Sequence, residues 1–444
     1  MMVVDLLAWV LADGAGRTVD PDSTALLWPG GSCTYQELNG RVDERARALA
    51  GEGLEPGSIR PIVASNDVAG VITLLAVWRC GATAAPLNPG LARREFAAAT
   101  RALSVGAATA GQLILWTSGT VGAARGVELS FDNLRASAMA VGGRLDLGPD
   151  DVWLASLSTA HVGGVALVTR ALMMGSAVFA AGPFDVEVAS KVVGTPVTHA
   201  SFVPTQLLRM LDHRPSRPPT SFRCALIGGA HAPPDLVARA LDAGWPISLT
   251  YGMTEMASQV ATATPRQVRA KPGTVGSPLD GVELRTDERG QLLVRGATRA
   301  VGYVGSDEAM ADADGWYRTG DLGYIDEAGD VWVTGRRIDR IVSGGVTVDA
   351  IEVEGVLRAH PSVADACVVG VQDAEWGEVV GAVVVPVEGE FDLDALDVAL
   401  RESLSAAKRP RLWWVASELP LNANGKVERA RVRSLLEDGR ALQN

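Results

Sequence analysis

The sequence predicts a mixed α/β fold with a large N-terminal domain and a small C-terminal domain, and three observations lead to this prediction. The chain has 444 residues, of which 47% are hydrophobic and 21% are charged, as in a globular protein that buries a sizeable core. From residue 113 onward, short apolar runs alternate with helical patterns. After residue 275, short strands separated by Gly or Asp turns interrupt this alternation, which returns after residue 337.

The first 90 residues predict helices packed around short strands. Thr34 stands directly before a helical pattern and Glu37 lies in its first turn, so we expect Thr34 to cap that helix. A Pro-Gly-Gly turn separates two short apolar runs, which predicts a pair of strands. The predicted helices are residues 6–11, 36–51 and 68–82, and the predicted strands are residues 25–28, 33–35 and 84–87.

The middle of the chain predicts two kinds of sheet. Continuous apolar strands that are separated by helices indicate parallel strands buried on both faces. These strands are residues 113–116, 152–155, 177–180, 199–203, 225–227 and 247–250. The strands of a smaller antiparallel unit are residues 282–286, 291–295, 323–325 and 331–334.

The C-terminal part again predicts mixed helices and strands. Its helices are residues 350–359, 393–404 and 428–437, and its strands are residues 364–371, 379–386 and 412–417. We place the domain boundary at residues 335–338. The two predicted domains therefore cover residues 1–336 and 337–444.

Charge and cysteine content exclude several classes of protein. With 40 basic and 52 acidic residues the net charge is −12, which argues against a general nucleic-acid binder, since such a protein needs a basic face. The four cysteines are far apart, which indicates buried thiols in a reducing compartment and no zinc site. No basic segment precedes the first apolar stretch, and the apolar runs 68–79 and 162–181 are too short or too broken to span a bilayer. The sequence therefore predicts a cytoplasmic protein.

The most informative motif is a loop of glycine and hydroxyl residues that directly follows the apolar strand 113–116. Such a loop can turn backbone N–H groups and hydroxyls toward a polyphosphate, and its glycines permit close approach because they lack a Cβ. A cation in the loop would offset the phosphate charge. The residues concerned are Thr117, Ser118, Gly119, Thr120, Gly122, Arg125 and Gly126.

Four further segments follow this loop in order. They are Tyr-Gly-Met-Thr-Glu at 251–255, Trp-Tyr-Arg-Thr-Gly-Asp-Leu-Gly at 316–323, Gly-Arg-Arg-Ile-Asp-Arg-Ile-Val-Ser-Gly-Gly at 335–345 and Asn-Ala-Asn-Gly-Lys-Val at 422–427. Together they resemble the signatures of the adenylate-forming superfamily, which comprises acyl-CoA synthetases, nonribosomal peptide adenylation domains and luciferases. The resemblance covers essentially the whole chain. It implies stacked α/β subdomains with a small β-barrel-like unit in the large domain, and a mobile C-terminal α+β domain.

The resemblance implies a role for each matched residue in joining a carboxylic acid to ATP. Two anions must meet, so catalysis needs positive charge and positioning. Glu255 would bind Mg²⁺, Thr254 would contact the α-phosphate, and Lys426 would bridge that phosphate and the attacking carboxylate. The remaining ATP contacts would be Thr117, Ser118, Thr120 and Arg125 on the β- and γ-phosphates, Asp321 and Arg336 on the ribose, and Gly228, Gly229, Tyr251 and Gly252.

The resemblance also implies a second half-reaction, in which CoA takes the acyl group. In this family the small domain rotates after adenylation, so Lys426 leaves and another face of the domain reaches the active site. Arg337, Ile338 and Asp339 would form the hinge. Gly344 and Gly345 would line the passage for the pantetheine arm of CoA, where side chains would obstruct.

Three features depart from the family pattern. Arg125 stands where most members have lysine, which keeps the charge but changes its shape. Ile338 replaces the first of two consecutive acidic residues in the hinge. Only 27 residues (90–116) separate Pro89 from the phosphate loop, so the sheet-and-helix segment that most members carry there is trimmed.

The short chain and four local segments resemble the o-succinylbenzoate–CoA ligases of menaquinone biosynthesis. The segments are residues 157–164, 198–209, 225–230 and 251–260. The resemblance places His161, Ser201, Thr205, Met253, Ser258 and Gln259 in the acyl pocket. A second carboxylate on the acid would need donors, and the nearest candidates in the sequence are Thr205, Arg209, Ser258 and Gln259.

The sequence leaves other functions open. It also fits an aryl- or medium-chain acyl-CoA ligase, and a stand-alone adenylating enzyme that loads a carrier protein in place of CoA. The non-enzyme alternative is an inactive paralogue that binds acyl-AMP or a nucleotide, although the intact Glu255, Asp321, Arg336 and Lys426 argue against it. The expected partners are a small carboxylic acid, ATP with Mg²⁺, and CoA, with no nucleic acid; a homodimer stays open.

Overall fold

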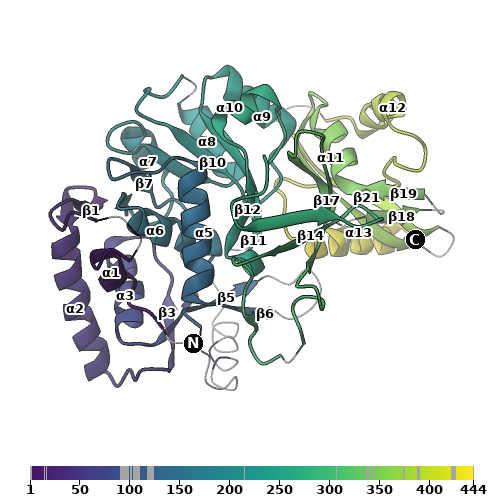
Figure 1. Ribbon diagram of the computed structural model, residues 1–444. Coiled ribbons are helices and arrows are strands. Elements are labelled where there is room, and N and C mark those ends of the chain that lie inside the picture. Colours follow the sequence, from purple (N-terminus) through teal and green to yellow (C-terminus); the bar gives the residue numbers. More distant parts are fainter. Residues whose placement is uncertain are drawn as a thin grey trace.

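The largest sheet of the computed structural model has eight strands in the order β12-β11-β10-β9-β7-β8-β1-β2 (Figure 1). The six strands from β11 to β1 are parallel, and β12 and β2 are antiparallel edge strands. The prediction of parallel strands is confirmed for residues 152–155, 177–180, 199–203, 225–227 and 247–250, whereas the strand predicted at 113–116 lies in a second, mixed sheet. The strands are β1 (Thr24–Trp28), β2 (Gly31–Thr34), β7 (Val152–Leu154), β8 (Ala177–Phe179), β9 (His199–Phe202), β10 (Cys224–Ile227), β11 (Ile247–Met253) and β12 (Ser258–Thr262).

The structure describes most of the chain, with gaps at several loops. The described residues are 3–14, 16, 18–90, 100, 103, 111–117, 125–214, 216–306, 308–336, 340–343, 346–373, 376–387, 391–421 and 427–443. No described helix is both long and apolar enough to cross a membrane.

Helices cover the large sheet and begin where the sequence provides caps. Thr34 caps α2 and forms a reciprocal capping box with Glu37, as predicted. The helix predicted over 68–82 ends at Arg79 because Gly81 adopts a positive φ of +71°. The helices of this part are α1 (Leu6–Leu11), α2 (Tyr35–Gly51), α3 (Val68–Arg79), α5 (Phe131–Arg144), α6 (Val162–Met173), α7 (Val186–Val192), α8 (Pro204–His213), α9 (Pro234–Asp242) and α10 (Pro265–Ala270).

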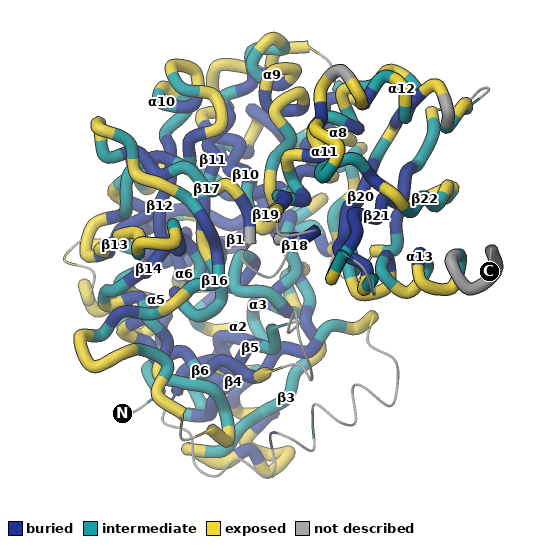
Figure 2. The backbone as a smooth tube through the Cα atoms, turned by 90° about the vertical axis from the view of Figure 1, so that its right-hand side faces the viewer, coloured by how far each residue is buried: buried dark blue, intermediate teal, exposed yellow. Residues whose placement is uncertain are grey.

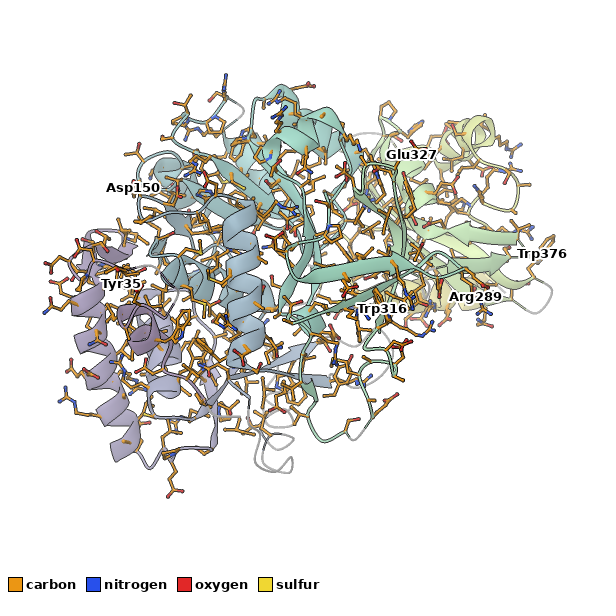
Figure 3. The ribbon with its side chains drawn as sticks, in the orientation of Figure 1. Tyr35, Asp150, Arg289, Trp316, Glu327 and Trp376 are labelled. Atoms are coloured by element: carbon orange, nitrogen blue, oxygen red, sulfur yellow. The ribbon has the colours of Figure 1, made fainter. Side chains whose placement is uncertain are left out.

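Helix α6 is the most deeply buried of these helices. It packs against β7, β8 and β12 on one side and against α1 and α5 on the other. Every residue from Gly164 to Met173 is buried. The buried Tyr35 at the start of α2 (Figure 3) donates its hydroxyl to the carbonyl oxygens of Leu172 and Ser176, at 3.3 and 2.8 Å, and so ties α2 to the end of α6.

A second sheet has the order β15-β6-β5-β4-β3. Its strands are β3 (Ile59–Val63), β4 (Thr83–Leu87), β5 (Leu113–Thr117), β6 (Arg125–Leu129) and β15 (Gly302–Tyr303). β5 and β6 form an antiparallel hairpin in which Thr117 is opposite Arg125. The predicted phosphate loop is therefore the connection of a hairpin. Its central residues, 118–124, lie outside the described part of the chain.

The region after residue 275 forms a four-stranded antiparallel sheet in the order β13-β14-β16-β17, as the turn-rich pattern predicts. Its strands are β13 (Val282–Thr286), β14 (Gln291–Gly296), β16 (Tyr317–Ile325) and β17 (Val331–Arg336). β16 is longer than predicted and already begins at Tyr317. The Thr-Gly-Asp-Leu-Gly segment is therefore part of a strand.

The C-terminal part, drawn in yellow-green in Figure 1, builds a five-stranded sheet with helices. β20 and β21 form a long antiparallel pair, and β22 runs parallel to β21. Its elements are β18 (Arg340–Ser343), β19 (Val346–Asp349), α11 (Ala350–Arg358), β20 (Val363–Asp373), β21 (Gly377–Pro386), α12 (Leu393–Ser403), β22 (Leu412–Val415) and α13 (Arg429–Gln443). Buried residues concentrate in β20 and β21, as they do in the strands of the large sheet (Figure 2).

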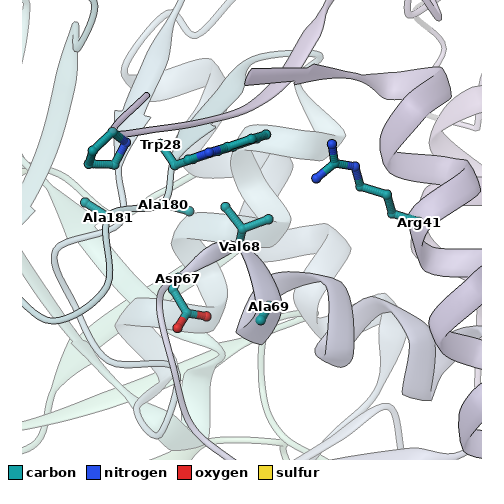
Figure 4. Close-up of a pocket in the computed structure, with 8 residues that line it drawn as sticks. Trp28, Arg41, Asp67, Val68, Ala69, Ala180 and Ala181 are labelled. Atoms are coloured by element: carbon teal, nitrogen blue, oxygen red, sulfur yellow. The ribbon is translucent and has the colours of Figure 1, made fainter. Parts of the chain in front are cut away.

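A groove of about 450 Å³ opens beside the carboxyl ends of β1 and β8 (Figure 4). Trp28 and Asp67 line it, and the guanidinium carbon of Arg41 lies 5.3 Å from the Trp28 ring. None of its lining residues belongs to the predicted site, which lies farther along the same edge of the sheet.

Candidate active site

Several predicted site residues gather at one edge of the large sheet. Because β7, β9, β10 and β11 are parallel, their carboxyl ends lie at the same edge, where α/β proteins bind ligands. His161 follows β7, Thr205 follows β9, Gly228 and Gly229 follow β10, and Gly252 is the last residue but one of β11. The topology therefore brings together segments that are up to 91 residues apart, from His161 to Gly252.

Two of the glycines at this edge are required by close contacts. A Cβ on Gly252 would overlap the carbonyl oxygen of Ser258 on the neighbouring strand β12. A Cβ on Gly228 would lie 2.6 Å from the Cγ2 of Thr250. The backbone at the edge is thus packed so tightly that only glycine fits.

The turn from β11 into β12 carries Thr254 and Glu255. Both lie in the short 3₁₀ helix η1 (Thr254–Met256). Ala257 and Ser258 then adopt positive φ values of 49° and 110°, which are costly for residues with a side chain. This strained turn reverses the chain and holds Thr254 and Glu255 at the end of β11.

Glu255 has a hydrogen-bond partner that the sequence analysis did not identify. The hydroxyl of Tyr303 donates to Glu255 Oε1 at 3.2 Å, and the hydroxyl of Tyr317 lies 3.4 Å from that of Tyr303. Burial raises the pKa of both phenols, so they are neutral hydrogen-bond donors at physiological pH. Tyr303 is 48 residues away from Glu255 in sequence, and no local pattern marks it.

The residues expected at the ribose also come together. Asp321 on β16 is opposite Arg336 on β17 in the antiparallel register. Asp321 is only 4% exposed, and the hydroxyl of Tyr251 donates to its Oδ2 at 2.7 Å. Tyr251 thus connects the end of β11 to the four-stranded sheet, which places the expected phosphate and ribose contacts on one continuous surface.

The ends of the phosphate loop are described. Thr117 donates its hydroxyl to the carbonyl oxygen of Arg125 at 3.2 Å. The Arg125 side chain is 49% exposed, its guanidinium carbon lies 3.6 Å from the centre of the Tyr303 ring, and its Nη2 lies 3.7 Å from Glu308. A Cβ on the neighbouring Gly126 would lie 3.2 Å from the Cγ2 of Val304 and 3.3 Å from the Cγ2 of Ile114.

Several predicted residues lie outside the described part of the chain. They are Ser118, Gly119, Thr120 and Gly122 of the phosphate loop, the hinge residues Arg337, Ile338 and Asp339, the CoA-passage residues Gly344 and Gly345, and Lys426. Their roles stay predictions.

The residues predicted for the acyl pocket fall into different environments. His161 is the N-cap residue of α6, and Met253 and Ser258 are half-buried at the β11–β12 turn. Ser201 is buried and accepts a hydrogen bond from Trp153 Nε1 at 3.1 Å. Gln259 is buried too, with its Oε1 accepting from the hydroxyls of Thr250 and Thr262. Thr205 and Arg209 are exposed on α8.

Arg170 is a buried cation in α6 that the sequence analysis did not single out. It is 2% exposed, and its Nε and Nη1 have no hydrogen-bond partner among the described residues. Its guanidinium carbon lies 4.1 Å from the ring of Trp153, which is the residue that binds Ser201. Burial lowers the pKa of Arg170 to about 9, so the group stays charged at neutral pH. An arginine within the apolar run 162–173 was the signal in the sequence.

A network of polar side chains packs against the ring of Trp153 through His199. The ring of His199 stacks on that of Trp153 with centroids 5.1 Å apart, and Thr198 and Asp151 bond its Nδ1 side. Burial lowers the pKa of His199 to about 4; the charges of Arg223 and Arg170 act in the same direction, and Asp151 opposes them. His199 is therefore neutral at physiological pH.

This network predicts a loss of stability in mild acid. Because the folded pKa of His199 lies below the ordinary 6.5, the unfolded chain binds more protons between pH 6.5 and 4, and the free energy of unfolding falls as the pH drops through this window. We expect a loss of about 3 kcal/mol across it. The free energy of unfolding is measured with urea at several pH values, and its change with pH should be clearly smaller for His199→Gln than for the unchanged protein. An equal change with pH in both proteins would assign the acid sensitivity to other groups.

The site suits a nucleotide with a bound divalent cation. Among the described residues there is no group of three or more His, Cys, Asp or Glu side chains that could hold a metal alone. Mg²⁺ prefers one or two carboxylates together with phosphate oxygens, and Glu255 at the strand edge provides such a carboxylate. The hydrogen bond from Tyr303 orients the Glu255 carboxylate.

A strand edge that brings together residues expected at phosphate, ribose and metal is typical of nucleotide-activating enzymes, and the family comparisons agree with this class. The AMP-binding enzyme family matches residues 15–109 and 106–304, and the AMP-binding enzyme C-terminal domain matches residues 352–426. The chain belongs to the AMP-binding enzyme family.

Individual proteins can also be compared with this chain in sequence and in structure. A 2-succinylbenzoate–CoA ligase of Bacillus anthracis (strain A0248) is 32% identical over 94% of this chain and 96% of its own length. The structure of o-succinylbenzoate CoA synthetase from Bacillus subtilis with the acyl-adenylate intermediate OSB-AMP superposes with a TM-score of 0.87, at 28% identity over 98% of each chain. The complex of that synthetase with ATP and magnesium ion has a TM-score of 0.86, at 27% identity over 98% of this chain and all of the other.

Replacing Arg125 by alanine should weaken ATP binding. Its guanidinium is exposed at the base of the phosphate loop, so its loss should raise the KM for ATP by roughly tenfold, the scale of one charge-assisted hydrogen bond, with little change in melting temperature. Arg125→Lys should lose much less ATP affinity because it keeps the charge. Steady-state kinetics with ATP varied checks this, with Arg135→Ala on the exposed face of α5 as the control. Unchanged ATP dependence in Arg125→Ala would make Arg125 a fold residue only.

Proposed function

We propose that this protein is an ATP-dependent o-succinylbenzoate–CoA ligase that works in two half-reactions. In the first, the succinyl carboxylate of the acid attacks the α-phosphate of ATP to give acyl-AMP and pyrophosphate. In the second, the thiol of CoA attacks the acyl carbon to give acyl-CoA and AMP. The relatives from Bacillus anthracis and Bacillus subtilis, which are similar over nearly the whole chain, support this assignment.

Residues expected for the first half-reaction lie at the strand edge, and Lys426 of the C-terminal part would complete the set. Mg²⁺ supplies positive charge to the phosphates when it is bound, and Glu255 would hold it. Asp321 would accept from the ribose hydroxyls, with Tyr251 fixing its carboxylate at 2.7 Å. Thr254 would donate to the α-phosphate, and Lys426 would stabilise the charge that develops there. ATP and CoA are both cytoplasmic compounds, and we place the reaction in that compartment.

The observation that carries the choice of acid is Arg170. o-Succinylbenzoate has two carboxylates, of which one reacts and the other stays charged in the pocket. A buried charge without a partner is costly, both for the acid and for the guanidinium. Arg170, with unpaired Nε and Nη1 and a Trp153 contact that leads to Ser201, would pair with the aryl carboxylate.

A panel of acids tests the proposal. The protein is mixed with ATP, Mg²⁺, CoA and one acid at a time, and products are read by mass spectrometry. We expect the thioester of o-succinylbenzoate, together with AMP and pyrophosphate. Pyrophosphate release without a CoA thioester would point to a carrier-protein acceptor, and no pyrophosphate with any acid would point to a nucleotide-binding paralogue. Equal turnover of benzoate or octanoate would replace the assignment by a general acyl-CoA ligase.

A further inference from the structure

The segment 300–304 joins the turn of Glu255 to the phosphate hairpin. On one side, the backbone N–H of Ala300 donates to the carbonyl oxygen of Glu255 at 2.8 Å. On the other side, Val304 N–H donates to the carbonyl of Gly126 at 2.8 Å, and β15 pairs with β6 so that Tyr303 is opposite Val127. The segment is therefore held by backbone bonds to both halves of the nucleotide site.

Tyr303 contacts a side chain on each half. Its hydroxyl donates to Glu255 Oε1 at 3.2 Å, while the face of its ring lies 3.6 Å from the guanidinium carbon of Arg125. The Tyr317 hydroxyl, 3.4 Å away, fixes the direction of the Tyr303 hydroxyl. One half-buried side chain thus links the carboxylate expected to hold the metal with the cation expected to hold the phosphates.

The ring of Tyr303 also accounts for arginine at position 125. A guanidinium is planar and weakly hydrated, so it can lie flat on an aromatic face, whereas an ammonium is a compact and strongly hydrated charge. Arg125 is half-exposed, and the stack on Tyr303 restricts the directions that its long side chain can take. An arginine held in this way provides a fixed cation at the base of the phosphate loop.

We propose that Tyr303 is a positioning residue for the nucleotide, whose hydroxyl orients Glu255 toward the metal and whose ring holds Arg125 at the phosphates. The proposal rests on the ATP and Mg²⁺ site of the proposed function and deepens it. Tyr303 touches neither substrate nor metal and acts through Glu255 and Arg125. The two contacts of Tyr303 can be tested separately, because one variant removes the hydroxyl alone and another removes the ring.

Tyr303→Phe tests the hydroxyl. We expect Mn²⁺, used as a probe for Mg²⁺, to bind the complex with a non-hydrolysable ATP analogue about tenfold more weakly, as for the loss of other groups that orient a metal ligand. Binding of AMP without metal and the melting temperature should stay unchanged. Mn²⁺ binding is measured by electron paramagnetic resonance, and AMP binding by calorimetry. Tyr324→Phe, on the exposed Tyr324 that stacks on Trp332, is the matched control. Wild-type Mn²⁺ affinity in Tyr303→Phe would overturn the role of the hydroxyl.

A double-mutant cycle tests the ring. Tyr303→Leu should weaken binding of the metal-free ATP analogue when residue 125 is arginine. In the Arg125→Lys background, the loss of affinity caused by Tyr303→Leu should be at least ~3-fold smaller, because only the guanidinium packs on the ring face. Additive effects would overturn the role of the ring. A fall in melting temperature with equal losses for AMP and the ATP analogue would make Tyr303 a fold residue only.

These binding assays contain neither acid nor CoA. If the acid panel contradicts the o-succinylbenzoate assignment, the measurements on Tyr303 keep their meaning. If Tyr303 proves to have no positioning role, the assignment of the acid is unaffected.

Discussion

Lys426→Ala is expected to slow formation of the acyl-adenylate by at least ~10²-fold, the scale of losing one group that stabilises developing charge. Lys426 is the lysine of the Asn-Ala-Asn-Gly-Lys-Val segment, which the family resemblance places between the attacking carboxylate and the α-phosphate. Thioester formation from preformed acyl-AMP should be nearly unchanged, because the lysine would have rotated away by then. The two steps are measured separately, as pyrophosphate release and as CoA thioester formed from added acyl-AMP.

The control for this prediction is another lysine of the C-terminal part. Lys408 lies on the surface and pairs with Glu352 at 2.6 Å, so Lys408→Ala should leave acyl-adenylate formation as it is. If Lys426→Ala slowed both steps equally, rotation of the small domain would not remove Lys426 between the half-reactions of this protein. Lys426 would instead serve both half-reactions from one position.

The second large effect concerns the aryl carboxylate of the acid. An analogue of o-succinylbenzoate that lacks this group should lose ~10²-fold or more in kcat/KM, because the donors of the pocket would be left unpaired. Arg170→Met, which keeps much of the side-chain volume without the charge, should lower kcat/KM for the true acid by a similar factor and change that for the analogue little. The variant should therefore no longer distinguish the two acids.

Arg209→Met is the matched control, because Arg209 is exposed on α8 although the sequence made it a candidate donor. The Arg209→Met variant should still distinguish o-succinylbenzoate from the analogue that lacks the aryl carboxylate. If Arg170→Met lowered kcat/KM equally for both acids, Arg170 would be a structural residue of α6. A long-chain fatty acid should be a poor substrate throughout, since the proposed pocket would end in the buried cation of Arg170 and would not accept an apolar tail.

Local features of the fold were predictable from the sequence. Thr34 and Glu37 form the capping box that starts α2, because the bonds of a cap join residues only three positions apart. The parallel strands were recognisable as continuous apolar runs, because both faces of such a strand are buried. The order of the family signatures likewise indicated the nucleotide site before any contact was known, and Gly252 is glycine where the β11–β12 hairpin leaves no room for a Cβ.

Contacts between distant segments were decided only in three dimensions. Asp321 meets Tyr251, and Tyr303 meets both Glu255 and Arg125, because strands from three sheets converge at one edge. Arg170 is buried because α6 is enclosed on both sides, whereas the candidate donor Arg209 is exposed on α8. Periodicity and caps depend on neighbours within one or two turns, so the sequence carries them directly. Which side chains face one another across the site depends on how whole elements pack, and no local pattern records that.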